Sequence, residues 1–267
     1  MTDALRAKYE QAGQGHVFTY WDKLSDSERA ELTAQLERID PAQMNAIVRK
    51  ALEADAAARE AKEAKIEPPP ADSFVSTVDD AARAEQLRSR GLAAVGAGQV
   101  GVLLLAGGQG TRLGSSAPKG CYNIQLPSGK SLFQLQAERI ARLQKLAAQA
   151  AGRDQVVVPW YIMTSGPTRK PTESFFAEHR FFGLDPANVI FFEQGTLPCV
   201  TNEGKIMLDA PSRVATAPDG NGGLYAALRA PRAPGQGSVL DDLKRRGVQY
   251  LHAYGVDNCL VLSLIHI

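Results

Sequence analysis

The glycine-rich stretch at 105–114 carries the clearest chemistry in the sequence. It reads Leu-Ala-Gly-Gly-Gln-Gly-Thr-Arg-Leu-Gly and directly follows an apolar run. Glycines let backbone N–H groups approach an anion closely, and a concave row of such donors binds phosphate oxygens. Arg112 adds a planar guanidinium suited to bidentate phosphate contacts, and Lys119, just after Pro118, can fold back toward the same anion. The stretch therefore predicts a phosphate-binding loop.

Two familiar phosphate-binding motifs do not fit this loop. The P-loop pattern GxxxxGK[ST] is absent, and the dinucleotide fingerprint GxGxxG fails because Leu113 stands where the third glycine belongs. An acidic residue about 20 positions further on, which would bind a ribose, is not apparent either. Taken alone, the glycines could also form a simple strand-to-helix turn, and Lys119 could be an ordinary exposed lysine.

The sequence around the loop predicts an α/β fold. Four apolar runs predict strands, at 100–105, 156–163, 189–193 and 250–256. Helical spacing of apolar residues falls between them, at 131–150, 173–180 and 239–246. This alternation indicates βαβ units and therefore a doubly wound, mostly parallel, Rossmann-like sheet.

Polar and flexible segments follow each of the four predicted strands, at 106–110, 164–166, 194–196 and 257–258. Because ligands of such sheets bind beyond the carboxyl ends of the strands, we expect these segments to line one crevice. A purely structural interpretation also remains open for these segments. Gln194 could cap a loop, and Asp257 could belong to a turn. The stretch 163–165 is equally compatible with packing and with substrate contact.

The first 70 residues predict a separate helical region. Ser25 and Glu28 have the spacing of a capping box, and Asp40-Pro41 is a typical helix start. Pro68, Pro69 and Pro70 predict a stiff linker. We therefore expect two domains, at 1–70 and 71–267.

The bulk composition excludes several classes of protein. The 267 residues include 30 basic and 29 acidic side chains, for a net charge of +1, so nothing suggests a nucleic-acid or membrane surface. No apolar run approaches the length of a membrane helix. The three cysteines, Cys121, Cys199 and Cys259, form no CxxC pair, which favours a reducing cytoplasm over a disulfide framework.

The loop and four later segments together resemble a known family. Residues 105–114 with Pro118-Lys119 are similar to the LxGGxGTRLGxxxPK signature of the UTP:sugar-1-phosphate uridylyltransferases, and most closely to the eukaryotic UDP-N-acetylglucosamine pyrophosphorylases. Further segments agree in order, at 159–165, 191–195, 217–225 and 256–258. The resemblance covers roughly 92–262, and it identifies 71–267 as a nucleotidyltransferase catalytic domain.

The resemblance also implies roles for individual residues. The backbone of Leu105, Ala106, Gly107 and Gly108 would hold the nucleotide, with Arg112 and Lys119 acting on the phosphates. Gln194 and the backbone of Gly220 would read uracil, whose N–H and carbonyls suit a carboxamide and a backbone group. Asn221 would contact the sugar-phosphate side, and Asp257 would bind substrate through Mg²⁺, which prefers hard oxygen ligands.

The implied reaction joins UTP to N-acetylglucosamine 1-phosphate, giving UDP-N-acetylglucosamine and pyrophosphate. Members of the family continue beyond the strand that carries Asp257 and use that later part to bind the sugar, whereas the residues after Leu262 depart from the family pattern. We therefore expect a C-terminally truncated chain without its sugar half-site. A UDP-glucose or broad-range pyrophosphorylase, a non-catalytic nucleotide-binding fragment and, more distantly, a dehydrogenase remain as alternatives.

Overall fold

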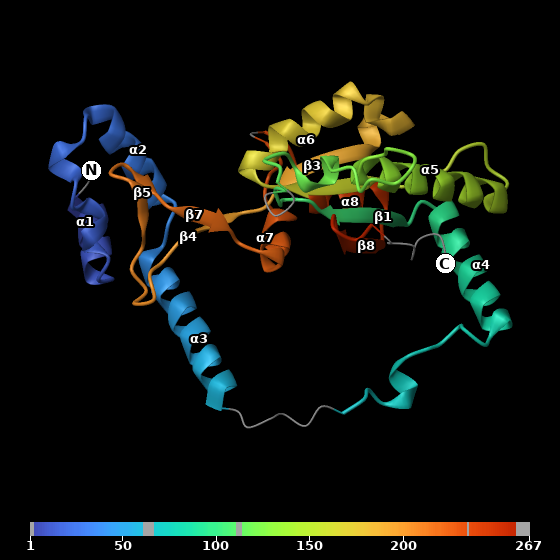
Figure 1. Cartoon of the computed structure of the whole chain (residues 1–267), viewed down its shortest axis with the longest axis horizontal. Helices are drawn as coiled ribbons and strands as arrows, with labels where there is room; N and C mark the ends of the chain where they lie inside the picture. The colour runs from blue at the N-terminus through green and yellow to red at the C-terminus, as the bar shows by residue number, and fades with distance from the viewer. Residues whose placement is uncertain (1–2, 61–66, 111–113, 234, 260–267) are drawn as a thin grey trace. The chain divides into compact units, whose positions relative to one another are not determined.

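A computed structural model gives the fold of the chain and describes residues 3–60, 67–110, 114–233 and 235–259. These residues divide into two compact units (Figure 1). The first unit combines Met1–Phe74 with Thr196–Ala217, and the second combines Val75–Gly195 with Pro218–Ile267. The boundary near residue 70 that the sequence suggests assigns 196–217 to the second domain, whereas the contacts group this segment with the N-terminal helices.

The first unit is built from helices and short strands. Its α-helices are α1 (Asp3–Gln11), α2 (Asp26–Glu37) and α3 (Pro41–Glu60), and its 3₁₀ turns are η1 (Gly15–Phe18), η2 (Trp21–Lys23) and η3 (Ala71–Ser73). Its strands are β4 (Thr196–Pro198), β5 (Leu208–Ala210), β6 (Arg213–Val214) and β7 (Thr216–Pro218), whose last residue already belongs to the second unit. The predicted capping box is confirmed, because Ser25 N donates to Glu28 Oε2 and Glu28 N donates to Ser25 Oγ.

Glutamine side chains attach the segment 196–217 to the N-terminal helices. Gln14 accepts from Ile206 N at 3.0 Å and donates to Gly204 O at 2.8 Å, and Gln35 accepts from Val214 N at 2.9 Å. Ile206 and Val214 then complete an apolar cluster with residues of α1, η1 and α2. Such contacts join residues almost 200 positions apart, so local sequence patterns could not reveal them.

The second unit contains a four-stranded parallel sheet with the order β3-β2-β1-β8. The strands are β1 (Val100–Leu105), β2 (Trp160–Thr164), β3 (Val189–Glu193) and β8 (Tyr250–Gly255). This confirms the predicted parallel α/β class. The chain moves from β1 outward to β2 and β3 and returns with β8 on the other side of β1, which makes the β1/β8 boundary a topological switch point.

Helices cover both faces of this sheet, as a doubly wound fold requires (Figure 1). They are α4 (Ala81–Gly96), α5 (Leu132–Ala151), α6 (Gly166–Glu178), α7 (Leu224–Ala227) and α8 (Val239–Arg246). Alternate strand residues serve alternate faces: Val102 and Leu104 pack in the cluster with α4 and α5, whereas Leu103 packs with α7 and α8. The unbroken apolar run of β1 follows from burial on both sides.

The remaining elements of the second unit are 3₁₀ turns. The turns are η5 (Lys119–Cys121), η6 (Arg180–Gly183), η7 (Pro186–Asn188) and η8 (Asn221–Gly223).

Two predicted boundaries differ from the structure. Strand β2 begins at Trp160 rather than 156, because Val158 N donates to the side chain of Gln144 instead of a neighbouring strand. Helix α6 begins seven residues before the predicted 173, since Pro167 suits the first helical turn. Within the described ranges, no helix combines the length and apolar character needed to cross a bilayer.

Candidate functional site

The carboxyl ends of all four parallel strands are level with one another. The register pairs Leu105 with both Met163 and Gly255, and Thr164 with Glu193. The polar segments that follow the strands therefore begin at one edge of the sheet. This is the arrangement expected from the sequence, and its centre is the switch point between β1 and β8.

Hydrogen bonds fix the course of the glycine loop after β1. Ala106 N donates to Met163 O at 2.8 Å, and Leu105 O accepts from Val256 N at 3.0 Å, so these two groups already serve the sheet. Further along, Lys119 N donates to Gly108 O at 3.1 Å and Gly110 N donates to Ala117 O at 3.0 Å. The loop thus closes on itself and brings Lys119 back beside Gly108. Arg112, predicted to contact phosphate, lies outside the described residues.

Lys119 and Asp257 meet across the switch point. Lys119 Nζ lies 2.8 Å from Asp257 Oδ2, and the two residues are 138 positions apart in the sequence. The lysine side chain is 24% exposed and the aspartate 66%, so the pair faces solvent. Such an exposed pair adds little stability, which leaves both charges available to a ligand.

Gly120 fixes the position of Lys119 through a contact that only glycine permits. A Cβ at this position would lie 2.2 Å from the ring of Phe133, which is completely buried on α5. Cys121 follows on the same turn. Burial, with a smaller contribution from the Glu178 carboxylate, raises the pKa of the Cys121 thiol to about 11, so it stays protonated at neutral pH. This turn presents the ammonium group of Lys119 and no thiolate.

Gln194, the first residue after β3, lies directly over the glycine loop. A Cβ on Gly107 would be 2.8 Å from its Oε1 and 3.2 Å from its Nε2. Gln194 N donates to Thr164 O at 2.9 Å, which holds the residue at the edge of the sheet. The carboxamide predicted to read uracil is therefore brought next to the backbone predicted to hold the nucleotide.

Gly220 and Asn221 reach the same neighbourhood through Asp219. Asp219 N donates to Gly195 O at 3.1 Å, and its carboxylate lies against the backbone of both Gly195 and Gly223. Gly220 has φ of 74°, a left-handed conformation that suits glycine, and begins the turn η8. Both Gly220 and Asn221 are exposed, and the bond from Asp219 to Gly195 joins their segment to the residue that follows Gln194.

Two buried polar residues support this edge, and the sequence gives no firm indication of either. Ser165 Oγ donates to Gly107 O at 2.7 Å. Gln136 on α5 donates to Val256 O at 3.5 Å, directly before Asp257, and its Oε1 has no partner in the described part of the chain. Helical spacing places Gln136 among apolar neighbours on the buried face of α5, which is the single signal that could have singled it out.

The residues present suit Mg²⁺ carried by phosphates better than a metal held by protein alone. No group of three or more His, Cys, Asp or Glu side chains that could hold a metal occurs within the described residues. Asp257 is an exposed carboxylate at this edge, and Mg²⁺ is commonly held by one or two carboxylates together with substrate phosphates and waters.

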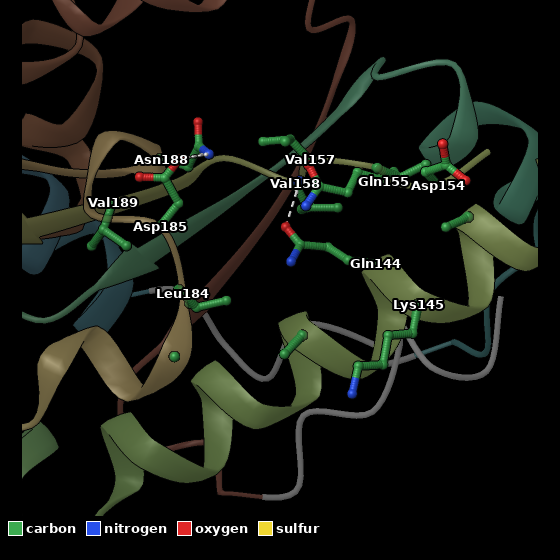
Figure 2. Close-up of a pocket in the computed structure, with 14 residues that line it drawn as sticks. Gln144, Lys145, Asp154, Gln155, Val157, Val158, Leu184, Asp185, Asn188 and Val189 are labelled. Carbon is green, nitrogen blue, oxygen red and sulfur yellow. Dashed lines mark hydrogen bonds between the residues drawn. The ribbon is translucent and has the colours of Figure 1, made fainter.

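A hollow of about 430 Å³ lies at the opposite, amino edge of the sheet (Figure 2). Its lining includes Lys145, Asp154 and Asp185, so charges of both signs are mixed. The dashed line in Figure 2 joins Gln144 to Val158 N, a 2.9 Å bond that ties α5 to the segment before β2. None of the predicted site residues lines this hollow.

Comparisons with known proteins identify the family of the chain. Residues 42–264 match the family described as UTP–glucose-1-phosphate uridylyltransferase. The chain belongs to this family. Among members of the family, UDP-N-acetylglucosamine diphosphorylase 2 of Arabidopsis thaliana is 47% identical over 264 residues, which cover 97% of this chain and 50% of the relative. The UDP-N-acetylglucosamine pyrophosphorylase of Saccharomyces cerevisiae is 42% identical, covering 97% and 54%.

A solved structure from the family supports the fold. The UDP-N-acetylglucosamine pyrophosphorylase of Trypanosoma brucei superposes with a TM-score of 0.81 at 36% identity, covering 97% of this chain and 52% of the other. The chain spans about half the length of the relatives it matches. The resemblance stated from the sequence is thereby confirmed, together with the fold class.

Proposed function

We propose that this chain forms the UTP-binding part of an enzyme that transfers a uridylyl group to N-acetylglucosamine 1-phosphate and releases pyrophosphate. The observation that carries the proposal is the meeting of Lys119, Asp257, Gly107 and Gln194 at the carboxyl edge of the sheet, contributed by three different strand ends. Relatives that are 42–47% identical to the chain are UDP-N-acetylglucosamine diphosphorylases or pyrophosphorylases by name, which supports the choice of the amino sugar.

The geometry suits a displacement that needs no protein nucleophile. A phosphate oxygen of the sugar 1-phosphate attacks the α-phosphorus of UTP, and the bond to the bridging oxygen breaks so that pyrophosphate leaves. The protein then has to align two anions and neutralise the charge that builds up between them. In the proposal, the N–H groups of the glycine loop and the Lys119 ammonium bind the leaving phosphates, and Arg112 adds a second cation.

Base recognition and the metal complete the proposal. The Gln194 carboxamide and the backbone of Gly220 pair with uracil, and Asn221 contacts the sugar-phosphate side. Asp257 holds Mg²⁺, which supplies a positive charge to the phosphate oxygens when bound. Lys119 contacts Asp257, and phosphates that enter the site would replace this contact with contacts of their own. We place the activity in the cytoplasm, because Cys121, Cys199 and Cys259 are all free thiols.

Calorimetric titration of the chain with UTP and with ATP, each with Mg²⁺, tests the nucleotide half of the proposal. We expect heat with UTP and much weaker binding of ATP, and equal heats would remove the uridine assignment. A pyrophosphate-release assay, on this chain and on one extended to the length of its relatives, tests the reaction. Faster release with glucose 1-phosphate than with N-acetylglucosamine 1-phosphate would favour the activity for which the family is named.

A further inference from the structure

Ser165 occupies a position between the end of β2 and the glycine loop. It is 3% exposed, and Thr168, one turn further along α6, is completely buried. Ser165 Oγ lies 2.7 Å from Gly107 O and 2.9 Å from Thr168 Oγ1, while Ser165 N donates to Thr168 Oγ1 at 3.0 Å. The two hydroxyls thus form a buried chain of hydrogen bonds that ends on the glycine loop.

The carbonyl of Gly107, where this chain of hydrogen bonds ends, sets the direction of the bonds. A carbonyl oxygen only accepts, so the proton of Ser165 points to Gly107 O. At Thr168, Ser165 Oγ can then act only as an acceptor, and the Thr168 hydroxyl, whose oxygen accepts from Ser165 N, lies 2.9 Å from Ser165 Oγ and 3.3 Å from Ser165 O. Because every member has its partner and the group is shielded from water, the arrangement is rigid.

Other serines at helix starts use their hydroxyl protons differently. Ser25 Oγ donates to Glu28 Oε2 at 2.6 Å, and Ser238 Oγ donates to Asp241 Oδ2 at 2.6 Å, each within its own helix. Ser165 instead donates away from α6, to a loop that lies 58 positions earlier in the sequence. Capping of α6 therefore does not account for this bond.

The bond to Gly107 O determines where the next N–H group points. In a trans peptide the carbonyl and the N–H lie on opposite sides, so the N–H of Gly108 points away from Ser165. A Gly-Gly peptide would otherwise rotate easily. The carbonyl of Gly108 is also held, by Lys119 N at 3.1 Å. The Gly108 N–H has no partner among the described residues, and the space beside its Cα is open.

We propose that Ser165 is a positioning residue for phosphate binding: it holds the Gly107–Gly108 peptide so that the Gly108 N–H faces the nucleotide phosphates. This inference rests on the proposed function. A preset donor is more effective than one that must reorient when the anion arrives. Ser165 then acts through the loop backbone and itself touches no ligand.

Titration of UTP and of uridine into the wild-type chain and Ser165→Ala tests the proposal. Because uridine carries no phosphate, its affinity should be unchanged, whereas the affinity for UTP should fall about tenfold, the loss expected for one preset hydrogen bond to a charged group. Ser238→Ala is the matched control, since it removes the hydroxyl of a buried helix-start serine that does not contact the loop. It should bind both ligands like the wild type.

Thr168→Val keeps the Ser165 hydroxyl but removes the Thr168 oxygen that contacts Ser165 Oγ and accepts from Ser165 N, so we expect a smaller loss of UTP affinity than in Ser165→Ala. Ser165→Thr should restore binding. Equal weakening of uridine and UTP in Ser165→Ala would indicate a purely structural role and overturn the inference. So would unchanged UTP binding in both Ser165→Ala and Thr168→Val. A wild-type chain that binds no UTP would overturn the proposed function and this inference with it.

Discussion

The two edges of the central sheet differ in what their polar groups do. At the amino edge, polar groups are paired with one another: Gln144 binds Val158 N, and Arg246 binds Asp242, Asn188 Oδ1 and Ala187 O. At the carboxyl edge, carbonyls are tied down while the Gly108 N–H, among the described residues, has no partner. A hollow alone, such as the one at the amino edge, therefore says less about function than donors that are fixed and unused.

Replacing one lysine at each edge of the sheet should give the largest difference in UTP affinity. Lys119→Met should weaken UTP binding about 100-fold, because it removes a charged contact to phosphate and leaves the Asp257 carboxylate uncompensated. Lys145→Met, in the exposed lining of the amino-edge hollow, should leave UTP binding unchanged. Titration calorimetry of both variants measures the difference, and equal losses would mean that the carboxyl edge has no special role.

Two glycine variants separate base recognition from phosphate binding within the carboxyl edge. Gly107→Ala places a methyl group against the Gln194 carboxamide and should reduce the preference for UTP over CTP about tenfold. Gly108→Ala meets no neighbour within 4 Å, so it should fold normally while its methyl group hinders the approach of phosphate. Competition binding with UTP, CTP and tripolyphosphate distinguishes the two. Identical profiles would contradict the separate roles.

At the amino edge we expect an effect on stability alone. Gln144→Leu leaves the buried N–H of Val158 without its acceptor, which should lower the free energy of unfolding by about 1 kcal/mol, since water in the adjoining hollow can replace part of the bond. Denaturant titration measures the change. Gln149→Leu, at an exposed position of the same helix, serves as the control. A loss of UTP affinity in Gln144→Leu would break the contrast between the edges.

The smallest expected effect concerns acid. Burial pushes the pKa of Asp242 upward, but the Tyr161 hydroxyl and the Arg246 guanidinium outweigh it, so the pKa lies below its ordinary value. The stabilisation is therefore present above the unfolded value of about 3.9 and is lost as the pH falls through the lower, folded value. Denaturant titrations at neutral and acid pH should show a smaller acid loss in Asp242→Asn than in the wild type. An identical loss of stability in both proteins would show that Asp242 does not contribute to the sensitivity to acid.

Local pattern was enough to predict the four strands of the parallel sheet, apart from the start of β2, but not the short strands β4 to β7 or the long-range pairings. The apolar run before Gly107 predicts β1 because burial on both faces leaves no polar position. The placement of Lys119 and Asp257 at one edge of the sheet followed from the family resemblance and the rule for parallel sheets, but their ion pair did not. In contrast, Ser165 lies in a stretch that the sequence left open between packing and substrate contact, since its partner lies on another strand end. The attachment of Ile206 and Val214 to the N-terminal helices was hidden for the same reason.

The position of β8 has a consequence for how the molecule assembles. Strands β1, β2 and β3 come from neighbouring parts of the chain, but β8 must return across about 150 residues to pair with β1. Contacts between such distant segments form slowly, because a long stretch of chain loses its freedom before any pairing is gained. On a ribosome, the first three strands emerge well before Tyr250. Among the residues that we assign to the nucleotide, Asp257 is then the last to arrive, and a nascent chain has glycine loop and lysine in place before their carboxylate is synthesised.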